Sequence, residues 1–149
     1  MNKKIPFSFG VDGDGNYGYY GADDSLIPFS GMDLENPLWV NPNATTSADF
    51  PAQTINLDLR LYKAVLIKCK YFHAESINGR TSIAFCEVGK SVQMTVCSNN
   101  PPATSGRHTS RGATVNTNGV VFGSSFLAPT DTSPYPNAYC VPIAIYGIK

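Results

Sequence analysis

The sequence predicts an all-β protein: an antiparallel, jelly-roll-like β-sandwich preceded by an extended N-terminal arm. Three observations predict this class. Short runs alternate apolar and polar residues, glycine and proline recur between the runs, and no window repeats apolar residues at helical spacing. Seven or eight short strands joined by such turns are typical of sandwiches. We expect residues 1–36 to form the arm or linker and residues 37–149 the sandwich domain.

The first strong strand signals follow Trp39. Residues 54–59 alternate strictly, so one face is apolar and the other polar. Residues 62–72 form the longest strand candidate, and their alternation predicts that Lys68 and Lys70 point away from the core.

Two Asn-Gly pairs predict hairpins further along the chain. The pair at 78–79 leads into a strand at residues 80–89, and a turn at Gly89 leads into residues 91–97. The second pair, at 118–119, joins residues 114–117 to residues 120–122.

The last strand candidate, residues 138–149, contains Pro142, which predicts an edge position or a bulge. Residues 98–112 are rich in Ser, Asn, Pro and Gly and contain no alternation, so we expect a long exposed loop there.

Composition limits the classes of partner. Eleven Lys and Arg residues balance eleven Asp and Glu residues, so no net field attracts nucleic acid or an anionic membrane. Charged residues make up 15% of the chain, whereas about 25% is typical of soluble domains. An uncharged polar surface is common on proteins that assemble with other copies or adsorb to polymers. The N-terminal stretch has no apolar run, so we expect neither a signal peptide nor membrane insertion.

The four cysteines have no metal-binding spacing. Cys69, Cys86 and Cys97 lie in apolar strand-like runs, where a free cysteine behaves as a small buried hydrophobe. We expect buried thiols, also for Cys140, and a disulfide is the alternative.

The stretch VDGDGNYGYYGADD at residues 11–24 is similar to a calcium loop. Asp12, Asp14 and Asn16 occupy positions 1, 3 and 5 of such a loop, but Tyr17 stands at position 6, where glycine is needed. Position 12 is Asp23 rather than Glu, and no helix pattern flanks the stretch. The pattern therefore favours a turn and linker over a calcium site, and we expect no cofactor.

Catalytic signals are weak. His73 and His108 are the two histidines, and neither accompanies a nucleophile motif. Asp58, Glu75 and Glu87 could supply paired carboxylates for glycoside hydrolysis, but no pattern selects them. We expect no enzymatic activity.

Aromatic and cationic side chains remain as candidates for binding. The N-terminal tyrosines could anchor a sugar or a protein, but we expect them to pack the arm against the sandwich or a neighbouring subunit. Donors in the 98–112 loop suit an anionic or sugar ligand. The candidate interaction surface comprises Tyr17, Tyr19, Tyr20, Arg107, His108, Arg111 and Tyr135.

Three stretches together carry a resemblance to a known group of sequences. The stretches are Asp12–Gly31, Leu38–Cys69 and the terminal Tyr139–Lys149. The second stretch contains the segments WVNPN (Trp39–Asn43) and QTINLDL (Gln53–Leu59), and a further segment, VNTNGVVFG (Val115–Gly123), lies between the second and third stretches. In order and wording the chain resembles the C-terminal domains of tail, fibre and other minor structural proteins of phages and prophages from Firmicutes and other gut bacteria.

This resemblance implies a non-enzymatic virion protein of the tail-tip, fibre or head-fibre type, made in the bacterial host cytoplasm and assembled into the virion. It implies other virion proteins as partners, a homotrimer by the habit of fibre tips, and binding to a host cell-wall glycan or surface protein. The alternatives are a carbohydrate-binding or depolymerase-like domain and a capsid decoration protein.

Overall fold

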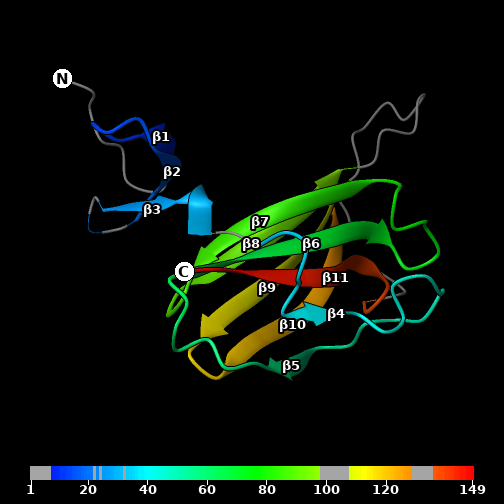
Figure 1. Cartoon of the computed structure of the whole chain (residues 1–149). Helices are drawn as coiled ribbons and strands as arrows, with labels where there is room; N and C mark the ends of the chain where they lie inside the picture. The colour runs from blue at the N-terminus through cyan, green and yellow to red at the C-terminus, as the bar shows by residue number, and fades with distance from the viewer. Residues whose placement is uncertain (1–7, 22, 24, 32, 98–107, 129–135) are drawn as a thin grey trace.

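The computed structural model describes residues 8–21, 23, 25–31, 33–97, 108–128 and 136–149 (Figure 1). In these ranges the chain forms eleven strands and one short 3-10 helix, which confirms the all-β prediction. The elements are β1 (Phe9–Val11), β2 (Tyr17–Tyr20), β3 (Leu26–Pro28), η1 (Phe29–Gly31), β4 (Trp39–Val40), β5 (Gln53–Asn56), β6 (Ala64–Phe72), β7 (Thr81–Glu87), β8 (Ser91–Cys97), β9 (His108–Asn116), β10 (Gly119–Ala128) and β11 (Tyr139–Ile148).

Strands β4 to β11 form two antiparallel sheets. Sheet I has the order β5-β10-β9-β8, and sheet II has the order β4-β11-β6-β7. Hairpins β6–β7, β8–β9 and β9–β10 stay within one sheet, while the chain crosses between the sheets after β4, β5, β7 and β10. The two layers face one another in Figure 1. The antiparallel sandwich predicted from the alternating runs is therefore confirmed.

The core lies between the two sheets and is built from the inward residues of both. Alternation places every second side chain of a strand in this layer, and burying an aliphatic or aromatic side chain stabilises the fold by about 1.5–3 kcal/mol. The fully or almost fully buried side chains include Val65, Ile67 and Cys69 of β6, Met94 and Val96 of β8, Val115 of β9, Val120 and Phe122 of β10, and Ile145 of β11.

The strand predicted over residues 54–59 is shorter in the structure, since β5 ends at Asn56. The next residues leave the ladder but follow the β9–β10 turn. The amide of Leu57 donates to the carbonyl of Asn118 at 3.1 Å, and that of Leu59 donates to Thr117 at 2.8 Å.

Strand β11 carries the bulge that Pro142 predicted. It is central in sheet II, between β4 and β6, and its register shifts between Pro142 and Ala144. Asn41 of the WVNPN segment holds this bulge: its amide donates to the carbonyl of Ile143 at 2.9 Å, and its Nδ2 donates to that of Pro142 at 2.8 Å.

The predicted exposed loop at residues 98–112 is wrong at its C-terminal end. Strand β9 begins at His108 and pairs with β8 and β10. The remainder of that loop, residues 98–107, lies outside the described residues. The sequence pattern does not predict this first part of β9, because the inward positions there are the polar residues Thr109 and Arg111 and no apolar–polar alternation results.

The N-terminal segment is more structured than the extended arm that the sequence predicted. Residues 8–31, which we call the N-terminal unit, contain the antiparallel sheet β1-β2-β3 and η1. Ile27 of β3 packs with Ala64 and Ile148, and the ring of Tyr19 lies 4.0 Å from that of Phe85. The unit therefore docks where β6 begins and where β7 and β11 end (Figure 1).

Candidate functional site

Arg111 is fully buried, against the expectation of an exposed loop cation. Its guanidinium donates four hydrogen bonds to main-chain carbonyls: Nε to Cys140 at 3.0 Å, Nη1 to Gly123 at 2.6 Å, and Nη2 to Tyr139 at 3.1 Å and Asn137 at 3.3 Å. Burial lowers the pKa of Arg111 to about 10, so the group remains a cation at neutral pH. The carbonyl oxygens thus replace the water that the charge loses.

Two backbone irregularities orient the carbonyls of Gly123 and Cys140 toward Arg111. The register of β10 shifts between Phe122 and Ser125, which turns the carbonyl of Gly123 toward the guanidinium. Cys140 has a φ of 42°, an uncommon value for a residue other than glycine. Such a conformation persists only where the surroundings hold it, and the bond from Arg111 Nε does so here.

Lys70 is the second buried cation, and the prediction that it points outward is wrong. Loops at the end of the sandwich fold over it, so it is only 1% exposed. Its Nζ donates to the carbonyls of Ala44 at 2.7 Å, His73 at 2.9 Å and Glu75 at 3.1 Å. Burial lowers the pKa of Lys70. The side chain joins the β4–β5 loop to the β6–β7 loop.

The four cysteines are free thiols in the structure, and three of them are buried as predicted. Cys97 is exposed instead, because β8 turns Val92, Met94 and Val96 inward. A hydrogen bond with Cys140 and burial raise the pKa of Cys69 well above its ordinary value, and burial raises that of Cys86 to about 11. A thiol must ionise to act as a nucleophile, so Cys69 and Cys86 are packing groups.

The three N-terminal tyrosines have different environments. Tyr17 is 72% exposed. Tyr19 stacks on Phe85 as described above, in line with the expectation that the arm packs against the sandwich. Tyr20 is buried inside the N-terminal unit, where its hydroxyl donates to the carbonyl of Val11 at 2.8 Å. Tyr20 is therefore removed from the candidate interaction surface.

The stretch compared with a calcium loop is the hairpin turn between β1 and β2. Asp12 Oδ1 accepts from the amides of Asp14 and Asn16, each at 2.9 Å, and Oδ2 accepts from Asn16 Nδ2 at 3.0 Å. Gly15 takes a φ of 82°, which glycine adopts without strain. These hydrogen bonds, led by that from Asn16, lower the pKa of Asp12. The described residues contain no cluster of three or more His, Cys, Asp or Glu side chains suited to a metal ion.

Of the three remaining residues of the candidate interaction surface, the structure describes one, His108. His108 is exposed at the start of β9, where it pairs with Cys97 and Ala128. Arg107 and Tyr135 lie outside the described residues.

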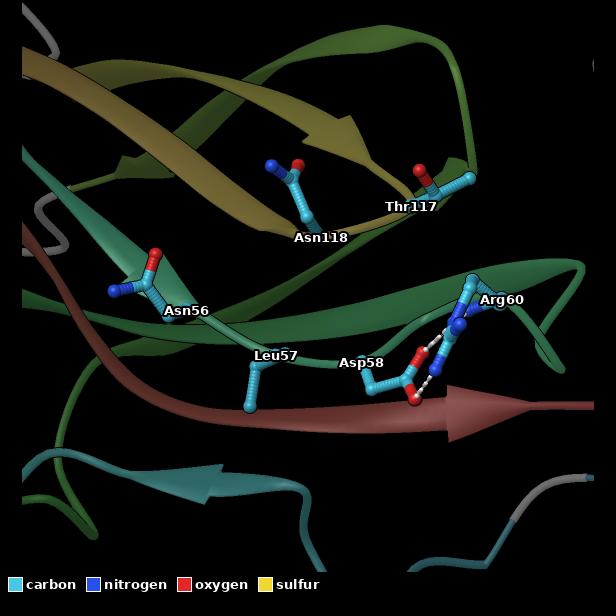
Figure 2. Close-up of a pocket in the computed structure, with 6 residues that line it drawn as sticks. All are labelled: Asn56, Leu57, Asp58, Arg60, Thr117 and Asn118. Carbon is cyan, nitrogen blue, oxygen red and sulfur yellow. Dashed lines mark hydrogen bonds and ion pairs between the residues drawn. The ribbon is translucent and has the colours of Figure 1, made fainter.

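The carboxylates considered for hydrolysis do not converge. Asp58 lies in an open cleft of about 530 Å³ beside the β9–β10 turn, and Figure 2 shows Arg60 bound to both of its oxygens. The distances are 2.8 Å from Nε and 2.7 Å from Nη2, and this pairing lowers the pKa of Asp58 to about 2. A general acid needs a raised pKa, so Asp58 does not suit that role.

The other two carboxylates lie at opposite ends of the β6–β7 hairpin. Glu75 accepts a bond from Arg80 Nη1 at 2.8 Å. Glu87 ends β7, next to the N-terminal unit: a Cβ placed on Gly21 would lie 2.6 Å from its Oε1.

The outer face of sheet I contains a second hollow, of about 450 Å³, over the first half of β8, the middle of β9 and the first half of β10. Gly112 and Gly123 form its floor, and Ser91, Gln93, Thr114 and Val121 line its sides. The β10 bulge lies opposite Gly112, and Gly123 of this bulge belongs to the lining of the hollow. No sequence motif marked this site, because it depends on two glycines from different strands lying side by side.

Compared with known proteins, the chain matches no family model, no curated protein and no solved structure. In the part of the chain that the structure describes, no helix is long and apolar enough to cross a bilayer.

Proposed function

We propose that the chain is a non-enzymatic structural protein of a phage particle, of the tail-tip, fibre or head-fibre type, that acts in assembly and in binding to the host surface. The observation that carries the proposal is the two-ended architecture of the sandwich. The N-terminal unit packs where β6 begins, and the loops held by Lys70 lie where β6 ends (Figure 1). The nine residues of β6 separate these ends by about 30 Å.

This architecture suits a protein that is attached at one end and presents loops at the other. Lys70 holds the β4–β5 and β6–β7 loops with main-chain hydrogen bonds, and Arg111 bonds the carbonyl of Asn137 just before β11, so ordering these segments on contact costs little conformational entropy. The sequence resemblance to phage tail and fibre domains supports the same role. The homotrimer belongs to this proposal, since closed symmetry is the rule for assemblies of one chain.

The N-terminal unit offers a surface for attachment. Phe9 is 68% exposed and Tyr17 is 72% exposed, although both are large aromatic side chains. Aromatic side chains are enriched in protein interfaces because they bury a large area at low entropic cost. We infer that this pair contacts a neighbouring virion protein or another copy.

The decisive test is the protein content of purified particles. Particles from a phage or induced prophage that encodes the chain are banded in a density gradient and analysed by mass spectrometry. We expect the chain in the particle band at a constant ratio to the other structural proteins. Its confinement to the soluble fraction would contradict the proposal.

The attachment surface is tested with the double variant Phe9→Ser, Tyr17→Ser. We expect the purified protein to stay folded but to enter particles in a strongly reduced amount. The matched control is Leu61→Ser, which removes a side chain that is 81% exposed on the sandwich. Equal incorporation of both variants would place attachment elsewhere.

A further inference from the structure

We propose that the outer face of sheet I binds a neutral oligosaccharide in the hollow over Gly112 and Gly123. This proposal rests on the host-binding part of the proposed function and assigns that part a site and a ligand class. The hollow differs from the tyrosines and loop cations that the sequence suggested. Its volume of about 450 Å³ falls within the range of ligand sites, about 300–1,000 Å³.

The charge pattern of sheet I determines the class of ligand. Among the residues of β5, β8, β9 and β10, Arg111 is the one that carries a formal charge at neutral pH, and it points into the sandwich. The described strand residues on the outward face therefore carry no Lys, Arg, Asp or Glu side chain that could pair with an acidic or basic ligand. An uncharged ligand loses no ionic hydration when it settles there, whereas a charged one does.

The side chains around the hollow match the two kinds of surface on a sugar. Gln93, Thr114 and Ser91 carry amide and hydroxyl groups, and the hydroxyls of Ser91 and Thr114 lie 2.8 Å apart. Val121 is 42% exposed beside them, and Phe126 is 52% exposed on the same strand beyond the bulge. A pyranose ring offers hydroxyls at its rim and C–H groups on its faces, so both kinds of side chain find a partner.

The glycine floor makes the hollow accessible to a ring. A Cβ on Gly112 would have Gln93 Oε1 as its neighbour at 3.6 Å, and one on Gly123 would have the Gly112 carbonyl at 3.7 Å. A larger residue would therefore fit at either position without collision. Because both residues are glycine, the space that such side chains would fill is open to a ligand.

A second copy of this chain fits the face less well. On the described part of the face, the exposed large hydrophobic side chains are Val121 and Phe126. A stable interface between copies needs an apolar core, and here hydroxyl and amide groups surround these two residues. The observations therefore favour the sugar.

The test is a titration of the full-length ¹⁵N-labelled chain with maltotetraose, cellotetraose and chitotetraose, and with tetragalacturonate as the acidic counterpart. We expect at least one neutral tetramer to bind at millimolar or lower concentration and to shift the amide signals of Gly112 and Gly123 and the side-chain amide of Gln93. No binding by any neutral tetramer overturns the proposal. Equal or tighter binding of tetragalacturonate also overturns it.

Variants that fill the hollow locate the site. Gly112→Thr and Gly123→Thr should weaken binding of the neutral tetramer about tenfold or more, which corresponds to a loss of about 1.4 kcal/mol. Gly13→Thr is the matched control, because a Cβ there meets no atom within 4 Å. Circular dichroism and an unfolding curve check each variant, and Gly112→Ala and Gly123→Ala replace any that fail to fold. If the folded variants at Gly112 and Gly123 bind the neutral tetramer with unchanged affinity, the proposal is overturned.

Light scattering without sugar distinguishes the second-copy alternative. If the mass of the chain increases with concentration and the same glycine amides shift, the face is a contact between copies and the sugar site is overturned. Particle incorporation is measured separately, so a virion protein that binds no sugar and a sugar-binding protein absent from particles give different results.

Discussion

Arg111 and Lys70 share one arrangement: a buried cation whose hydrogen-bond partners are main-chain carbonyls. Arg111 joins β9 to β10 and β11, and Lys70 joins β6 to two loops. The planar guanidinium can bond four carbonyls from different directions, whereas an ammonium has three donors. Arg111 thereby bonds β11, which lies in the other sheet and is not paired with β9, and Lys70 connects two loops that no ladder joins.

Replacing Arg111 should destabilise the protein strongly. Arg111→Leu removes the donor from the buried carbonyl of Cys140 and from the partly buried carbonyls of Gly123 and Tyr139, and we expect a loss of about 3–5 kcal/mol in the free energy of unfolding. Arg111→Lys should recover part of this loss, because lysine lacks the fork. Urea unfolding measures both variants.

Arg60→Leu is the control for Arg111, since the Arg60–Asp58 pair lies on the surface and water screens it. We expect its unfolding midpoint to stay close to that of the wild type. An equally small change in Arg111→Leu would contradict the structural role of Arg111.

At the scale of elements, strand β11 shows how the WVNPN segment works. A bulge breaks the pairing of β11 with β6, and Asn41 bonds the carbonyls of Pro142 and Ile143 that the bulge turns away. Its Oδ1 also accepts from the amide of Asn43 at 2.9 Å, which shapes the loop that follows β4. One asparagine thus fixes both the bulge and the direction of the chain.

Removing the Asn41 side chain should weaken sheet II locally. Asn41→Ala leaves the Pro142 carbonyl without its donor in a buried position, and we expect a loss of about 1–3 kcal/mol. Faster hydrogen exchange at the amides of residues 139–145 would locate the effect. Asn43 is an exposed residue of the same segment, so Asn43→Ala should change neither the free energy of unfolding nor the exchange of these amides. Equal effects in both variants would contradict the role assigned to Asn41.

At the scale of the whole molecule, the N-terminal unit and the sandwich share a small apolar contact. Ile27, Ala64 and Ile148 form its centre, and Leu66 and Phe85 pack around them. A contact of this size is far smaller than the sandwich core, so the unit should detach before the sandwich unfolds.

Truncating Phe85 should loosen this docking selectively. In Phe85→Ala the ring of Tyr19 loses its stacking partner, and we expect amides of β2 and β3 to exchange faster while those of β6 and β9 keep their protection. Ile83→Ala is the control, because Ile83 lies on the same strand and is 62% exposed. If amides throughout the sandwich lost protection from exchange to the same extent, the N-terminal unit would not open separately from the sandwich.

Much of the fold could be predicted because its signals are local. Alternation in residues 62–72 identified β6, and the turn at Gly89 identified the start of β8. The Asn-Gly pair at residues 118–119 identified a turn, and Pro142 identified a bulge. Each of these signals depends on residues that are neighbours in the sequence.

The candidate site was predicted less well, because it is formed by residues that are distant in the sequence. Period-two alternation placed Lys70 outside and low-complexity composition placed Arg111 in a loop, yet both are buried. Nothing near them in the sequence shows that carbonyls from residues 44, 73, 123 and 140 converge on them.

The sequence by itself determined the all-β class, several of the turns and the apolar face of β6, because steric preferences and burial repeat with the period of a strand. Tertiary structure decided the order of strands in the two sheets, the burial of Arg111 and Lys70, and the docking of the N-terminal unit on β7. It also brought Gly112 beside Gly123 to open a hollow on sheet I. These features depend on which distant segments meet, and that is determined by packing of the whole chain.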